Sequence, residues 1–139
     1  MKLGIIGSGG REHALCTFLK KSNKVDKIYC FPGNAGTSLI AENVNVDLNN
    51  FEKLKDHIKK FEIDIVVVGP EKPLVDGIVD FLEKSQIKVF GPNKIASQLE
   101  GSKIFTKNLC RKYNIPTADF GIFEDIEKCL SFLEKCKFP

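Results

Sequence analysis

The sequence has no long hydrophobic run. Its longest stretch of consecutive large apolar residues, Ile65–Val68, is far shorter than the roughly 20 residues that a helix needs to cross a bilayer. After Met1 and Lys2, the short apolar stretch Leu3–Ile6 leads directly into glycines, so the apolar region of roughly 7 to 15 residues that marks a secretory signal is missing. A transit-peptide pattern is missing too. We therefore expect a cytoplasmic protein without a membrane partner.

Disulfide and zinc-binding patterns are also absent. The cysteines are odd in number and include no C-x-x-C pair, which argues against both a disulfide framework and a zinc site. Reduced thiols in a cytosol fit this pattern best. The cysteines are Cys16, Cys30, Cys110, Cys129 and Cys136.

The sequence also lacks a large excess of charge of either sign. The 21 basic and 18 acidic residues give a formal net charge of +3, and they form no block of like charges of the kind found in nucleic-acid-binding tails. We therefore expect no nucleic-acid partner. The small positive excess suits an anionic small molecule about as well as it suits no ligand at all.

The chain does contain a regular alternation of short β-branched runs and longer helical patterns, which predicts an α/β fold with a parallel sheet. Predicted strands are Leu3–Ile6, Lys27–Phe31, Val44–Val46, Ile63–Val68 and Ile87–Phe90. Predicted helices are Arg11–Lys21, Asn50–Phe61, Val75–Lys84, Ser102–Tyr113 and Asp125–Lys135, with an extended segment at Ala118–Phe123. The fourth strand is apolar on both faces, so we expect it at the centre of a Rossmann-like doubly wound sheet.

The composition, 42% hydrophobic and 28% charged over 139 residues, allows one globular domain or one domain plus the opening of another. The pattern of elements changes after Gly91-Pro92. We place a domain boundary near residue 100 and interpret residues 101–139 as an incomplete second domain.

The glycine-rich segment Gly7–Gly10 follows the first predicted strand and opens the first predicted helix. Backbone amides and the helix dipole bind phosphate at such a position, and glycines let the anion approach the amides. The segment differs from a dinucleotide fingerprint, because Glu12 stands where a small residue is required and Phe31–Asn34 replace the acidic residue expected after the second strand. We therefore predict a phosphate site and disfavour NAD.

Three charged or titratable residues follow the glycines, and each allows two interpretations. Arg11 offers a fork of donors to a phosphate, but an exposed arginine is equally ordinary. Glu12 could contact a ligand, or it could do no more than complement the positive end of the helix dipole. His13 suits either a ligand contact or the packing of a first-turn residue.

Two further polar loops, Pro32–Thr37 and Gly69–Pro73, follow the second and fourth strands. In a sheet of order 3-2-1-4-5, strands one and four are neighbours and their carboxyl ends frame a crevice. This order places Glu71 beside the glycine loop, where its carboxylate would accept hydrogen bonds from ribose hydroxyls or an amine. Glu71 could also be an ordinary surface carboxylate, and Gly33 and Asn34 could form no more than a turn.

Four motifs in one order and spacing resemble the phosphoribosylamine–glycine ligases, a family of ATP-grasp enzymes. The motifs are Gly7-Ser8-Gly9-Gly10-Arg11-Glu12-His13-Ala14, Pro32-Gly33-Asn34-Ala35-Gly36-Thr37, Val68-Gly69-Pro70-Glu71 and Leu99-Glu100-Gly101-Ser102-Lys103. Each motif alone is weak, whereas the ordered set is specific. The likeness runs from Met1 to about Ala118 and becomes weaker after that.

The resemblance implies that residues 1–100 are the substrate-binding, pre-ATP-grasp domain and that residues 101–139 begin a truncated ATP-grasp domain. It implies a ligase for 5-phosphoribosylamine and glycine, with ATP and Mg²⁺ (or Mn²⁺) as cofactors of a full-length enzyme that is a monomer or weak dimer. It assigns no catalytic or metal-binding residue. It maps substrate binding onto Gly9, Gly10, Arg11, Glu12, His13, Gly33, Asn34 and Glu71, and contact with nucleotide phosphates onto Lys103.

The resemblance also implies that most of the ATP site, including the glycine-rich lid and the magnesium carboxylates, lies outside residues 1–139. We therefore expect no tightly bound cofactor and no turnover from this polypeptide alone. Three alternatives stay open at this point. They are another ATP-grasp enzyme of the purine pathway, a Rossmann-type module that senses a nucleotide without catalysis, and an interaction domain with an empty crevice.

Overall fold

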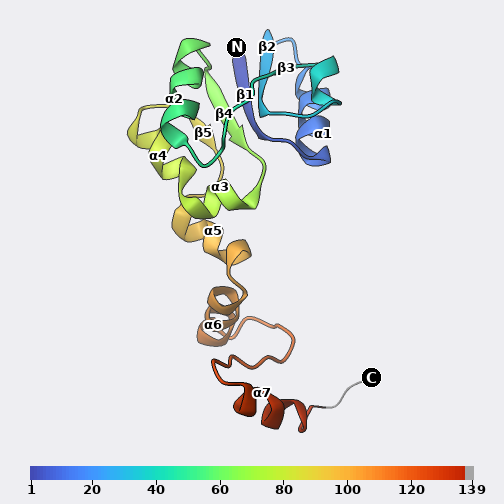
Figure 1. Cartoon of the computed structure of the whole chain (residues 1–139), viewed down its shortest axis with the longest axis vertical. Coiled ribbons are helices and arrows are strands. Elements are labelled where there is room, and N and C mark those ends of the chain that lie inside the picture. Colours follow the sequence, from blue (N-terminus) through green and yellow to red (C-terminus); the bar gives the residue numbers. More distant parts are fainter. Residues whose placement is uncertain (137–139) are drawn as a thin grey trace. The chain divides into compact units, whose positions relative to one another are not determined.

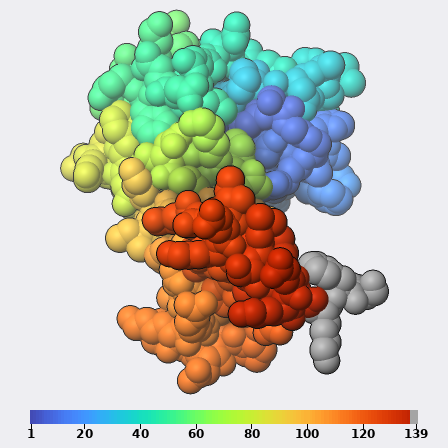
Figure 2. All heavy atoms as spheres, turned by 60° about the horizontal axis from the view of Figure 1, so that its bottom comes forward, coloured from blue at the N-terminus to red at the C-terminus, as the bar shows by residue number. Residues whose placement is uncertain are grey.

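The computed structural model describes residues 1–136, and the chain divides after Gly101 into two compact units. Figure 2 draws the units with all their heavy atoms, from blue to yellow for most of the first and from orange to red for the second.

The first unit alternates strands and helices around one sheet (Figure 1). Its strands are β1 (Lys2–Gly7), β2 (Lys27–Pro32), β3 (Glu42–Asn43), β4 (Ile65–Val68) and β5 (Val89–Phe90). Its helices are α1 (Gly10–Leu19), α2 (Phe51–Lys60), α3 (Glu71–Asp76), α4 (Ile78–Lys84) and α5 (Lys94–Gly101), with a 3₁₀ turn η1 (Thr37–Leu39). The strands are parallel in the order β3-β2-β1-β4-β5. The predicted α/β fold with a doubly wound parallel sheet is therefore confirmed.

Alternate residues of each strand point to opposite sides of the sheet, and helices cover both of the resulting faces. On one face, Ile6 and Val66 are buried in a cluster with Leu54 of α2 and residues of α4. On the other face, Ile5 is buried in a cluster with Cys16 of α1. Figure 1 shows α1 on the side of the sheet opposite α2 and α4. As predicted, β4 is an inner strand, since it pairs with both β1 and β5.

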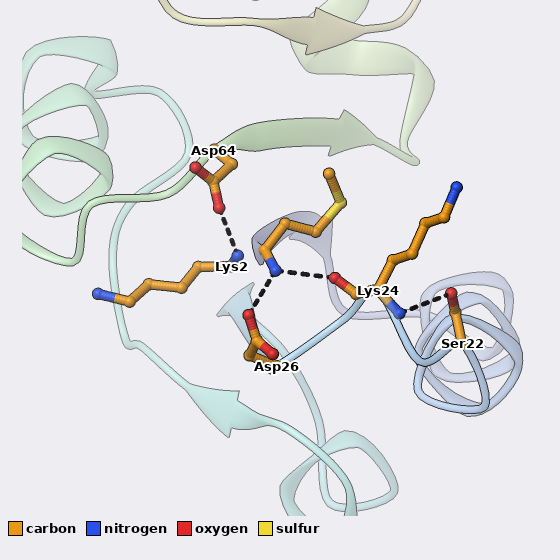
Figure 3. A network of polar contacts seen from close by, with 6 residues as sticks. Lys2, Ser22, Lys24, Asp26 and Asp64 are labelled. Atoms are coloured by element: carbon orange, nitrogen blue, oxygen red, sulfur yellow. Dashed lines mark hydrogen bonds and ion pairs between the residues drawn. The ribbon is translucent and has the colours of Figure 1, made fainter.

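The amino end of β1 is tied to its neighbours by polar contacts (Figure 3). The amino group of Met1 donates to the carbonyl oxygen of Lys24 at 2.8 Å and pairs with the carboxylate of Asp26 at 2.5 Å. On the other side, the amide of Lys2 donates to the carboxylate of Asp64 at 2.6 Å. These contacts fix β1 between the chain segments that lead into β2 and β4.

The predicted strand Val44–Val46 is wrong, because the third strand is the shorter β3 just before it. The amide of Val44 still donates to the carbonyl oxygen of Cys30 at 2.8 Å, but the chain then leaves the regular pairing with β2. Val46 is buried in the core on the α2 side of the sheet. Its apolar character therefore reflects packing against the α2 face of the sheet and not membership of a strand.

The helices around β5 also differ from prediction. The single helix predicted at Val75–Lys84 is two helices, because Gly77 adopts a left-handed conformation with φ of 96° between α3 and α4. Helix α3 begins at Glu71, inside the segment that the sequence predicts as a loop. Helix α5 was not predicted. The side chain of Asn93 caps its start by accepting a hydrogen bond from the amide of Ala96 at 2.8 Å.

The second unit contains α6 (Lys103–Tyr113) and α7 (Ile126–Leu133). Both match the predicted helices apart from their ends, and a side chain caps each start: the Ser102 hydroxyl accepts from the amide of Phe105, and the Asp125 carboxylate from that of Glu127. Neither helix has a fully buried residue. Within residues 1–136, no helix is long and apolar enough to span a membrane.

The core of the first unit predicts how two matched substitutions differ. Leu54 is fully buried, whereas Leu39 is 83% exposed. We expect Leu54→Ala to lower the free energy of unfolding by about 2–5 kcal/mol, because it leaves a cavity, and Leu39→Ala to change it by less than about 0.5 kcal/mol. Urea unfolding followed by circular dichroism measures both. Equal losses for the two variants would contradict the described core.

Candidate functional site

The glycine loop connects the carboxyl end of β1 to the first turn of α1. Gly7 has φ of 128°, a backbone conformation that residues with a side chain rarely adopt. The amide of Gly9 donates to the carboxylate of Glu12 at 2.6 Å. The amides of Gly10 and Arg11 belong to the first turn of α1, where a helix supplies no acceptor of its own. Together with the helix dipole, they provide the donors of an anion site.

The loop after β4 lies beside the glycine loop, as the predicted strand order requires. Arg11 joins the two loops, because its guanidinium donates to the carbonyl oxygen of Gly69 at 2.8 Å and forms an ion pair with Glu71 at 2.8 Å. The hydrogen bond from Arg11 lowers the pKa of Glu71, and the same bond raises the pKa of Arg11. Glu71 therefore stays ionised at the edge of the crevice.

A pocket of about 540 Å³ opens where the two loops meet. Five of the predicted substrate-binding residues line it, namely Gly9, Gly10, Arg11, Glu12 and Glu71. Its full lining is Gly7–Glu12, Leu48, Asn49 and Pro70–Pro73. The structure thus assembles the two predicted halves of the crevice within the first unit.

The other lining residues were not predicted as site residues, and Leu48, Asn49 and Lys72 are the most informative of them. Leu48 and Asn49 come from the segment between β3 and α2, where the polar residues Asp47, Asn49 and Asn50 were the available signal. Lys72 lies next to Glu71 and forms an ion pair with Asp76 at 2.5 Å. Arg11 and Lys72 balance the charges of Glu12 and Glu71, so the lining side chains carry no net charge.

The loop Pro32–Thr37 supports the glycine loop and does not line this pocket. The amide of Gly33 donates to the carbonyl oxygen of Gly7 at 3.1 Å. The side-chain amide of Asn34 donates to the carbonyl oxygens of Ser8 and Gly9 at 2.9 and 3.1 Å. By engaging these carbonyl oxygens, Asn34 fixes the orientation of the peptide groups in the glycine loop.

A small polar network holds Asn34 in turn. The amide of the fully buried Thr37 donates to the side-chain oxygen of Asn34 at 2.9 Å. The side-chain amide of Asn43 donates to the carbonyl oxygen of Asn34 at 2.7 Å. Gly33 is required here, because it has φ of 76° and an added Cβ would lie 2.2 Å from the side-chain oxygen of Asn43.

The remaining two predicted residues lie away from the pocket lining. His13 faces the loop after β2, since a Cβ added at Gly36 would lie 3.1 Å from its ring. Lys103 is the first residue of α6 in the second unit, and its side chain is exposed. Among residues 1–136, no group of three or more His, Cys, Asp or Glu side chains is placed to hold a metal ion.

Comparison with known proteins shows a clear family likeness. The profile of the family described as "Phosphoribosylglycinamide synthetase, N domain" matches residues 1–100. The phosphoribosylamine–glycine ligase of Clostridium acetobutylicum is 48% identical over 139 residues, which are 100% of this chain and 33% of that protein. The chain therefore spans about a third of the length of the curated relatives it matches.

Solved structures show the same fold. The crystal structure of phosphoribosylamine–glycine ligase from Thermotoga maritima aligns with a TM-score of 0.74 at 30% identity, covering 99% of this chain and 31% of that one. The biotin carboxylase domain of 2-oxoglutarate carboxylase from Hydrogenobacter thermophilus, solved with MgADP and bicarbonate, aligns with a TM-score of 0.71 at 18% identity, covering 99% of this chain and 33% of that one.

The Arg11–Glu71 pair predicts a measurable titration. In the unsubstituted chain, the pKa of Glu71 lies below its ordinary value of 4.5, mainly because Arg11 donates a hydrogen bond to it. Any stability that the pair contributes is therefore present above that value and is lost as the pH falls through the lowered pKa. We expect Arg11→Ala to raise the pKa of Glu71 towards 4.5, as measured from its carboxyl resonance by NMR.

Lys72→Ala is the matched control, because Lys72 pairs with Asp76 and not with Glu71. We expect it to leave the pKa of Glu71 nearly unchanged. An equal rise in both variants would show that general positive charge, and not the hydrogen bond from Arg11, sets the pKa.

Proposed function

The chain belongs to the phosphoribosylglycinamide synthetase N-domain family, and from this premise we propose that it is the amino-terminal part of an ATP-dependent ligase of purine biosynthesis. The ligase joins glycine to 5-phosphoribosylamine. ATP activates the carboxylate of glycine, and the amine of 5-phosphoribosylamine forms the amide of glycinamide ribonucleotide, with release of ADP and phosphate. Relatives named phosphoribosylamine–glycine ligase match the whole chain, which supports the proposal.

In this proposal, the pocket between the two loops holds the ribose-phosphate end of 5-phosphoribosylamine. The observation that carries it is the meeting of the first-turn amides of α1 with the Arg11–Glu71 pair in one pocket. The amides of Gly10 and Arg11 receive the phosphate, helped by the helix dipole. Glu71 accepts hydrogen bonds from ribose hydroxyls or the amine. Asn34 and Gly33 act one step away, by holding the glycine loop.

We assign the nucleotide and its metal ion largely to sequence that the longer relatives contain beyond the matched third. Among the described residues, no group of three or more His, Cys, Asp or Glu side chains is placed to hold a metal ion. Lys103 is proposed to reach the nucleotide phosphates, with ATP and Mg²⁺ bound by the full-length enzyme. That enzyme is proposed to be cytoplasmic and a monomer or weak dimer.

Ribose 5-phosphate binding tests the pocket. We expect it to shift the amide resonances of Gly7–Glu12, whereas NAD and ATP leave them unchanged. A Cβ added at Gly10 meets no atom within 4 Å, so Gly10→Leu should fold normally while its side chain crowds the amides. We expect it to weaken binding at least about tenfold, or about 1.4 kcal/mol.

Ala96→Leu is the control for this titration, because Ala96 is exposed on α5 and does not line the pocket. It should bind ribose 5-phosphate as the unsubstituted chain does. Unweakened binding by Gly10→Leu, or a response of the loop to NAD in place of the sugar phosphate, would contradict the proposed site.

The proposal also predicts that residues 1–139 alone do not catalyse the reaction. Phosphoryl transfer requires metal ions and positioned phosphate contacts together, and in this proposal most of the ATP site belongs to the two thirds of the longer relatives that this chain does not match. We expect no glycinamide ribonucleotide when the purified chain is incubated with ATP, Mg²⁺, glycine and 5-phosphoribosylamine. A full-length relative assayed in parallel is the positive control, and product formed by this chain alone would refute this division of labour.

A further inference from the structure

We infer that Glu12 is a positioning residue, whose buried carboxylate shapes the glycine loop for an anion and does not itself bind the ligand. The inference concerns the same site as the proposed function, and its ligand-binding consequence rests on that function. The contacts of Glu12 within the protein do not depend on any ligand.

The first observation is the burial and pairing of the carboxylate. Glu12 borders the pocket, yet only 4% of its surface is exposed. Its side chain is therefore part of the pocket wall and is not free to contact a ligand. One oxygen, Oε2, accepts a hydrogen bond from the amide of Gly9 at 2.6 Å. Glu12 is the third residue of α1 and Gly9 its N-cap. In this place the positive end of the helix dipole stabilises the negative charge.

The second observation is that three glycines close around this one side chain. An added Cβ would lie 2.6 Å from Cδ of Glu12 at Gly7, 2.9 Å from Oε2 at Gly9 and 2.0 Å from Oε1 at Gly69. Gly7 is the last residue of β1, Gly9 lies in the loop that follows it, and Gly69 lies in the loop after β4. The two loops therefore approach each other across the carboxylate, which fills the space that their missing side chains leave.

These contacts restrict how the loop can bind an anion. The amide of Gly9 is already engaged by Glu12, so an incoming phosphate must use the amides that follow it, at Gly10 and Arg11. The bond to Gly9 also fixes the turn that leads into those amides. Removing the carboxylate should therefore weaken phosphate binding although the carboxylate does not touch the phosphate.

A coupling experiment tests the packing without any ligand. Gly69 does not have a positive φ, and the three atoms nearest to an added Cβ, at 2.0 to 3.0 Å, all belong to Glu12, so the contact with Glu12 is the main obstacle to Gly69→Ala. We expect this substitution to lower the urea midpoint clearly in the unsubstituted chain and to have little effect in Glu12→Ala, where the opposing atoms are gone. Gly4→Ala is the control, since a Cβ at Gly4 meets Ile63 and Phe31 and not Glu12. It should shift the midpoint equally in both backgrounds. An equal loss from Gly69→Ala in both backgrounds would overturn the packing role.

Ligand binding and the amide resonance of Gly9 distinguish positioning from direct contact. Glu12→Gln keeps the shape of the side chain and an acceptor oxygen. We therefore expect the affinity for ribose 5-phosphate to stay within about threefold of that of the unsubstituted chain. The Gly9 amide proton should move upfield, because its acceptor has lost its charge. In Glu12→Ala, we expect a larger upfield shift and an affinity at least about tenfold lower. Equal loss of affinity in both variants with an unchanged Gly9 resonance would make Glu12 a direct ligand and overturn the inference.

The two proposals fail in different ways. If the unsubstituted chain does not bind ribose 5-phosphate, the proposed function fails, while the Gly69 coupling and the Gly9 resonance still decide the role of Glu12. If Glu12→Ala does not fold, the comparison of Glu12→Gln with the unsubstituted chain remains. An unchanged Gly9 amide resonance in Glu12→Gln then overturns the inference.

Discussion

The parallel pairing of β1 with β4 is the constraint on which the rest of the site depends. Its register places Ile6 opposite Val68, so the glycine loop and the loop that begins at Gly69 leave the sheet at the same level. Residues far apart in sequence thereby come within reach of one arginine side chain, as the bond from Arg11 to the carbonyl oxygen of Gly69 shows. The apolar faces of β4 make this pairing stable, because helices cover both sides of the sheet.

On the proposed function, the pocket attracts a phosphate although its lining charges cancel, because the attraction comes from oriented backbone dipoles. Of the four charged lining groups, Arg11 and Glu71 neutralise each other, Lys72 pairs with Asp76, and the carboxylate of Glu12 accepts a hydrogen bond from the amide of Gly9. What remains directed at the pocket is the amino-terminal turn of α1, with its donors and its partial positive charge. Net sequence charge was therefore uninformative about this site, as its small value of +3 suggested.

The alternation of strands and helices predicted the doubly wound sheet, and the common strand order of such sheets then implied that the two loops meet. Short elements were harder. The strand predicted at Val44–Val46 was wrong because burial below a sheet and pairing within it give the same apolar signal. The break at Gly77 depends on one left-handed glycine, which periodicity does not show. Residue roles were hardest, since nothing in the spacing tells whether Glu12 or Asn34 points at a ligand or at the backbone.

On the proposed function, the family has separated sugar-phosphate binding from ATP chemistry along the chain. The residues that line the pocket all lie between Gly7 and Pro73, and the first unit has its own core on both faces of the sheet. The helices of the second unit have no fully buried residue. A preformed binding loop needs a rigid frame, and the first unit supplies one through the Asn34 and Glu12 contacts before any nucleotide is involved.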